Sequence, residues 1–392
     1  MNSLLSAGLI LLLGFVGARI LKLVRLPNVT AFLIVGIIIG PQILNLVTVE
    51  IFTASEFFSN LVLGLIAFSL GESFRFDKIR QGMKQVMWIS IVAALGAWIL
   101  VSTALIIYFI TIKLPIYPAI VLGAAASATA PAATVLVIRE YRASGMLTEL
   151  LLKVVAIDDA WCLIFAAMAI AVGNAMRAEV FEMSIIFAGL GEIFGALLLG
   201  GALGYVSSRL SKFVRTREEL LIYTLGLLLF NVGLSIALEV SVLLSAMMMG
   251  LVMINMAREN YRFFEVVRSV DTPLYLAFFI ISGAHLDFGV LYKMGIAGIL
   301  YVAFRTIGKV YGAKLGAKLS DAPKAAGDWL GLSLAPQAGV ALGIGLVAKT
   351  TFPDFGDYIF TIIAATSVVF ELVGPLLTKY SLKKAGEIAS TE

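Results

Sequence analysis

Two adjacent carboxylates, Asp158 and Asp159, lie within a long apolar stretch of this sequence. The segment from Lys153 to Gly173 reads KVVAIDDAWCLIFAAMAIAVG, which is long enough to cross a bilayer. An ionised side chain is costly at that depth, so intramembrane carboxylates usually mark a functional site. Adjacent helical residues point about 100° apart, so the two carboxylates can face different partners. Because like charges so close oppose each other's ionisation, the pair predicts a site where a proton and a cation compete.

A lysine at a similar depth, Lys309, lies in the segment FRTIGKVYGAKLG. A lysine inside a membrane either pairs with a carboxylate or loses its proton. We therefore expect Lys309 to contact the aspartate pair. The alternative is a buried salt bridge that joins two helices and has no further role.

The elements that carry these residues are membrane-spanning helices. The chain has 392 residues, of which 60% are hydrophobic and only 14% charged, and its mean hydropathy is +1.01. Apolar runs of about 20 residues recur from end to end and predict about thirteen spans. The first run, from Leu4 to Leu21, has no basic residues before it and is interpreted as a span rather than a signal peptide. We expect one membrane domain over residues 1–392 and no soluble regulatory domain.

Basic residues in the connecting loops predict the topology. One set of loops holds most of them, including Arg139, Arg142, Arg209, Lys212, Lys318, Lys324, Lys379 and Lys383. The opposite set holds only Lys113, Arg177, Lys293 and Lys349. By the positive-inside rule the N-terminus lies outside the cell and the C-terminus in the cytoplasm, as an odd number of spans requires.

Two of the expected spans contain a proline among small residues. Pro131 interrupts the helix expected over residues 117–138, and Pro336, followed by Gln337, interrupts that over 329–347. Either proline alone is equally typical of a simple kink. The two interrupted helices lie seven spans apart and therefore cross the membrane in opposite directions. This arrangement indicates an inverted repeat, with approximate halves at 56–206 and 272–382.

Other polar groups at membrane depth have simpler interpretations. We expect Arg305 and Glu371 to form a structural ion pair between two helices. The single histidine, His285, is interpreted as an interface residue, with pH sensing as the alternative. Glu72 is interpreted as a solvated helix end. The single cysteine, Cys162, excludes an intrachain disulfide, and no nucleotide-binding or metal-binding motif indicates an enzyme or a cofactor.

Four segments together resemble the cation:proton antiporter superfamily. In chain order these are SATAPAATVL, IDDAW, TIGKVYGAKLG and LSLAPQAGVALG. They are most similar to the NapA/NhaA-like sodium/proton antiporters that carry an Asp-Asp pair. The segment RLPNVTAFLIVGIIIGPQIL also resembles the first repeat unit of that superfamily. The sequence departs from it where Ala130 replaces an expected aspartate and where Gln337 follows the second proline in place of an arginine.

The resemblance implies an all-α NhaA-like antiporter fold with a dimerisation domain and a mobile core domain that holds two crossed discontinuous helices. It implies a homodimer, with Asp159 as the principal carrier of cation or proton and Asp158 paired with Lys309. The two aspartates are then the candidate ligands of a transported Na⁺. The residues that it implies at the two helix breaks are Thr129, Ala130, Pro131, Pro336 and Gln337.

The sequence therefore predicts a secondary antiporter of the plasma membrane that exchanges Na⁺ or Li⁺ for protons with net charge movement and contributes to pH homeostasis. A K⁺/H⁺ antiporter is the alternative, because carboxylate and carbonyl oxygens accept either ion. A further alternative is a sodium-coupled symporter of an organic anion. A passive channel or a membrane sensor is the remaining class.

Overall fold

The computed structural model describes residues 2–23, 26–76, 82–178, 183–214, 216–257, 260–286, 289 and 293–388. These residues form α-helices joined by short turns, and no strand occurs among them. Two compact units share the chain, one formed by Met1–Gln81 with Gly191–Leu286 and the other by Gly82–Leu190 with Asp287–Glu392. We call them unit 1 and unit 2, and each is described by itself.

The described residues of unit 1 form the α-helices α1 (Ser3–Lys22), α2 (Asn28–Ile39), α3 (Val49–Gly71), α10 (Arg217–Ala237), α11 (Val242–Met256) and α12 (Asn260–His285), together with most of α9 (Met183–Leu210). Glycines bring α3 and α11 close together. A Cβ atom at Gly250 would lie 2.3 Å from the carbonyl oxygen of Phe68. Small residues of this kind allow membrane helices to pack tightly.

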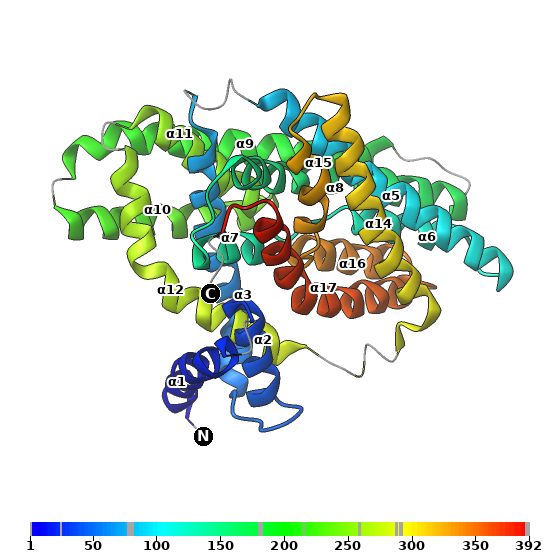
Figure 1. Ribbon diagram of the computed structural model, residues 1–392, viewed down its shortest axis with the longest axis horizontal. Helices are drawn as coiled ribbons and strands as arrows, with labels where there is room; N and C mark the ends of the chain where they lie inside the picture. The colour runs from blue at the N-terminus through cyan, green and yellow to red at the C-terminus, as the bar shows by residue number, and fades with distance from the viewer. Residues whose placement is uncertain are drawn as a thin grey trace. The chain divides into compact units, whose positions relative to one another are not determined.

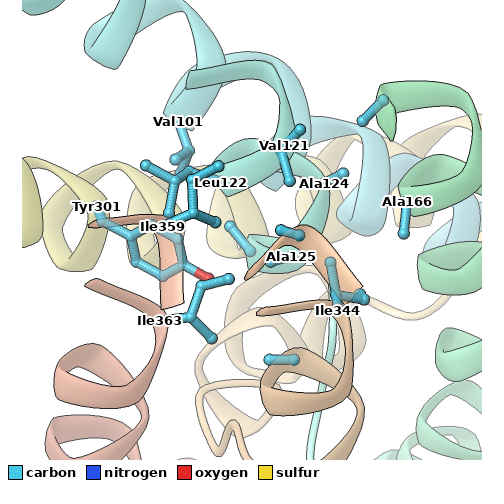
Figure 2. Packing of buried hydrophobic residues seen from close by; sticks show 14 of the residues in the cluster. Val101, Val121, Leu122, Ala124, Ala125, Ala166, Tyr301, Ile344, Ile359 and Ile363 are labelled. Atoms are coloured by element: carbon cyan, nitrogen blue, oxygen red, sulfur yellow. The ribbon is translucent and has the colours of Figure 1, made fainter. Parts of the chain in front are cut away.

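Unit 2 contains α5 (Met83–Thr111), α6 (Tyr117–Ala126), α7 (Pro131–Glu140), α8 (Met146–Ala178), α14 (Gly295–Leu319), α15 (Lys324–Ser333), α16 (Gly339–Thr351) and α17 (Gly356–Lys384). Figure 1 labels these helices and shows α5 and α14 beside each other. Buried apolar side chains from most of them form one continuous core, part of which is drawn in Figure 2. The aspartate pair lies on α8 and Lys309 on α14.

Glycines at four-residue intervals hold α14 against α5. Gly308, Gly312 and Gly316 lie on one face of α14, each against the backbone of α5. A Cβ atom at Gly308 would lie 2.6 Å from the carbonyl oxygen of Gly96. This close packing fixes the rotation of α14 about its axis, and with it the direction in which Lys309 points.

The two expected interruptions are present. The helix predicted over 117–138 consists of α6 and α7, separated by residues 127–130, and that over 329–347 consists of α15 and α16, separated by 334–338. Eight helical segments, counted among the described residues, are long and apolar enough to cross a membrane. The expected count of thirteen spans and the repeat boundaries stay predictions.

The contact between α5 and α14 gives a first testable prediction. Gly308→Ala should lower the free energy of unfolding by about 1–3 kcal/mol, because the added methyl group meets backbone that has no room to move. Thermal unfolding of the detergent-purified protein measures this change. Gly226→Ala, in α10, is the matched control, since nothing lies within 4 Å of its added Cβ. Equal melting temperatures for the two variants would contradict the prediction.

Candidate functional site

The two helix interruptions meet each other. The backbone N–H of Ala130 donates to the carbonyl oxygen of Pro336 over 2.8 Å, so the first break is hydrogen-bonded to the second. Pro131 begins α7, where its missing N–H costs nothing because the first turn of a helix has no intrahelical acceptor for it. The residues expected at the breaks, Thr129, Ala130, Pro131, Pro336 and Gln337, lie in or next to the two interruptions, and we call the place where these meet the helix crossing.

Arg305 satisfies the carbonyl groups that the interruptions leave free. Its guanidinium group donates to the carbonyl oxygens of Ala126 over 3.0 Å, Ala128 over 2.6 Å and Ala335 over 2.7 Å. These carbonyls lie at or just after the C-terminal ends of α6 and α15, where helix dipoles place partial negative charge. The side chain is fully buried. Arg305 thus places a positive charge between the ends of both half-helices.

The expected ion pair between Arg305 and Glu371 is not formed. No salt bridge joins them within the part of the chain that the structure describes, and Oε2 of Glu371 is buried there without a hydrogen-bond partner. The guanidinium group also lies 4.2 Å from the ring centroid of Phe370, the residue before Glu371. Sequence reasoning failed here because a buried arginine can be satisfied by backbone carbonyls as well as by an acid.

Lys309 and Asp158 form a buried ion pair. Nζ of Lys309 lies 2.6 Å from Oδ2 of Asp158, and the two side chains are 1% and 0% exposed. The same Nζ donates to the carbonyl oxygen of Ser127 over 2.5 Å and contacts Oγ1 of Thr129 at 3.0 Å. Thr129 donates its hydroxyl to Oδ2 of Asp158. The first helix break, α8 and α14 are therefore joined by one closed polar network.

Asp159 is buried beside this network, with one oxygen free. The residue is 3% exposed, and its Oδ1 atom has no hydrogen-bond partner among the described residues. Oδ1 of Asp158 is also buried without a partner, but that carboxylate is held through Oδ2, whereas neither oxygen of Asp159 is held by a described residue. Because buried polar groups are nearly always hydrogen-bonded, a carboxylate without any partner at this depth indicates a ligand position. Within the residues that the structure describes, no group of three or more His, Cys, Asp or Glu side chains is arranged to hold a metal ion. A cation at Asp159 would depend on carbonyl and hydroxyl oxygens for its other contacts.

Gln337 connects the second break to the first interrupted helix. Its Nε2 atom donates to the carbonyl oxygen of Ala125 over 2.9 Å and to the hydroxyl oxygen of Tyr301 over 2.7 Å. Figure 2 shows Tyr301 among the apolar residues of the core, near Ile363. Sequence analysis missed Tyr301, although Tyr301, Arg305 and Lys309 follow one another at four-residue intervals on one face of α14.

Two other polar residues lie outside the crossing, in unit 1. Glu72 lies at the C-terminal end of α3, where the sequence placed it, and forms an ion pair with Arg268 that the sequence did not predict. Nδ1 of His285 is 2.8 Å from the carbonyl oxygen of Ile281, and its ring packs edge to face on Phe52. The role of His285 stays a prediction.

Crossed discontinuous helices that meet at buried charged groups define a class of secondary transporters. The chain belongs to the sodium/hydrogen exchanger family, whose transmembrane model matches residues 8–383. This match confirms the antiporter resemblance and supports exchange of a monovalent cation for protons. Members of this family are transporters rather than enzymes.

Proteins of known name and structure agree with this assignment. The chain is 23% identical over 389 residues to the ammonium/H⁺ antiporter subunit AmhT of Alkalihalophilus pseudofirmus, covering 97% of this chain and 96% of that protein. Two structures of the sodium/proton antiporter MjNhaP1 of Methanocaldococcus jannaschii share its fold. One, at pH 8, has a TM-score of 0.67, 21% identity and coverage of 97% and 95%. The other has a TM-score of 0.75, 18% identity and coverage of 98% of each chain. The all-α antiporter fold is thereby confirmed.

The carbonyl contacts of Arg305 give a second testable prediction. Arg305→Gln should lower the free energy of unfolding by about 3 kcal/mol or more, because several buried carbonyl groups lose a charged donor. It should also lower transport, since the two breaks are no longer drawn together. Thermal unfolding and proteoliposome transport measure the two effects. Arg217→Gln, at an exposed position in α10, should change neither; normal stability in Arg305→Gln would contradict the role assigned to the guanidinium group.

Proposed function

We propose that this protein exchanges Na⁺ or Li⁺ for protons and moves net charge in each cycle. The observation that supports this most directly is the difference between the two adjacent aspartates. Asp158 is held through its Oδ2 atom by Lys309 and Thr129, whereas no hydrogen bond or ion pair holds Asp159 within the described part of the chain. Asp159 is the position at which a cation and a proton replace each other.

The charge balance of the exchange depends on Lys309. If only Asp159 took part, one cation would replace one proton and no net charge would move. The ion pair between Lys309 and Asp158 supplies a second site for a proton when it opens, because Lys309 then releases its proton or Asp158 accepts one. Two protons then exchange for one cation, and the cycle becomes sensitive to the membrane potential.

The chemistry of the ligands admits several monovalent cations. Carboxylate, hydroxyl and carbonyl oxygens suit Na⁺ and Li⁺, and K⁺ uses the same donors at longer distances. The relative named for ammonium makes NH₄⁺ a second candidate, since its N–H groups donate to the same oxygens. A sodium-coupled symporter of an organic anion is the alternative outside antiport.

We further propose that the protein acts in the plasma membrane as a homodimer. In this proposal unit 1 is the dimerisation domain, and unit 2, which holds both discontinuous helices, is the mobile core domain. The N-terminus lies outside the cell and the C-terminus in the cytoplasm, as the distribution of lysines and arginines indicates. Exchange in this orientation would contribute to pH homeostasis.

The proposal is tested first at Asp159. Purified protein in liposomes with an imposed proton gradient should release protons when Na⁺ or Li⁺ is added, and Asp159→Asn should reduce the rate at least a hundredfold, because a neutral amide neither binds a proton nor balances a cation. K⁺, NH₄⁺ and an organic anion with Na⁺ are compared in parallel. Asp354→Asn, which removes an exposed ion pair with Arg177, is the control. Full exchange in Asp159→Asn would exclude this carboxylate as the carrier.

A separate prediction concerns the coupling ratio. Lys309→Gln should keep measurable exchange but lose net charge movement, because only Asp159 then carries a proton. A voltage-sensitive dye in proteoliposomes, read together with the proton flux, measures the number of charges moved per cation. If Lys309 were only a structural partner of Asp158, the variant would be less stable but would move the same charge per cation.

A further inference from the structure

A basic cavity lies at the ends of α14 and α15, away from the helix crossing. Its volume is 470 Å³, and its lining includes Lys314, Lys318 and Lys324 together with Tyr311 and Leu315. Lys314 is 3.9 Å from Asp328, the one acidic side chain among the described residues that line the cavity. No ion pair joins Lys318 or Lys324 to an acidic group among the residues that the structure describes. The cavity therefore carries a net positive charge that its own walls do not balance.

The depth of the cavity in the membrane follows from the length of α14. This helix has 25 residues and is about 37 Å long, which exceeds the thickness of about 30 Å of the hydrocarbon layer. Its last two turns, which hold Lys314 and Lys318, therefore reach the level of the lipid headgroups, and Lys324, at the start of α15, lines the same cavity. Anionic phosphates are concentrated at that level.

An apolar strip leads from the cavity toward the middle of the membrane. Ile307, Tyr311 and Leu315 follow one another at four-residue intervals on α14 and are 41%, 66% and 51% exposed. Leu315 and Tyr311 also line the cavity. A ligand with an anionic head and a hydrocarbon chain fits both parts, whereas inorganic phosphate or a nucleotide would use only the lysines.

We propose that this cavity binds the headgroup of an anionic glycerophospholipid, with Lys318 and Lys324 contacting the phosphate and one acyl chain lying along Ile307, Tyr311 and Leu315. Lys309 and Arg305 lie on the same helix, about two to four turns before Lys318. A bound lipid would therefore hold the end of the helix that carries both charges of the crossing. The inference rests on membrane insertion alone and does not depend on which cation the protein transports.

The test uses the full-length protein purified in detergent and titrated with phosphatidylglycerol or phosphatidylcholine, with native mass spectrometry counting bound lipids and thermal unfolding measuring stabilisation. Phosphatidylglycerol should bind preferentially. The double variant Lys318→Gln, Lys324→Gln should bind it about 25-fold more weakly, at about fivefold for each lysine. Lys383→Gln, which removes an exposed lysine outside the cavity, should bind it like the wild type.

Further measurements distinguish the lipid from a small anion. Inorganic phosphate and glycerol phosphate at the same concentrations should not stabilise the protein; stabilisation equal to that by the lipid would show a small-anion site and overturn the proposal. Equal binding of phosphatidylglycerol by the double variant and the wild type would overturn it as well. If the double variant does not fold, Lys318→Gln alone should show the fivefold loss, and wild-type affinity in that variant counts against the site.

Discussion

The structure of unit 2 depends on one constraint, which is that backbone groups inside a bilayer need hydrogen-bond partners within the protein. Two interrupted helices expose carbonyl groups where no water of the bulk solvent replaces the missing intrahelical bonds. Arg305 donates to carbonyls from both interruptions at once, and the N–H of Ala130 is bonded to Pro336. A discontinuous helix is tolerated at this depth because the other discontinuous helix and one arginine complete its hydrogen bonding.

Two faces of α14 contribute to satisfying these backbone groups. One face packs against α5, and the other points toward the two breaks. Gly308, Gly312 and Gly316 pack against the backbone of α5, which leaves α14 little freedom to rotate. Residues at positions 301, 305 and 309 then point together at the two breaks, where they contact Gln337, the free carbonyls and Asp158. The glycines bind no ligand themselves, but their packing determines where Tyr301, Arg305 and Lys309 lie. The sequence of α14 therefore determines both its tight packing against α5 and the position of its charged side chains.

The sequence predicted the parts of this site that have a strong local signal. Pro131 and Pro336 predicted the two interruptions, and the depth of Lys309 in the membrane predicted its contact with the aspartate pair. The partner of Arg305 was predicted wrongly, because contact with backbone carbonyls leaves no trace in the identity of any other residue. The contact between Tyr301 and Gln337 was missed for a related reason, since tyrosine in an apolar helix is typical of ordinary core packing. The four-residue spacing of Tyr301, Arg305 and Lys309 was the signal that could have indicated this contact.

The two positively charged side chains at the helix crossing, Arg305 and Lys309, already have their hydrogen-bond partners. This explains why Asp159 is left to bind an exchangeable proton or cation. Arg305 is held by carbonyls, and Lys309 is held by Asp158, Thr129 and the carbonyl of Ser127. Neither has a strong donor left to fix the second carboxylate permanently. A buried carboxylate without a resident partner is stabilised by a proton or a cation that arrives from solution. Adjacent positions on α8 let the two aspartates face different partners. The donors around the first helix break then make Asp158 part of the scaffold and leave Asp159 for exchange.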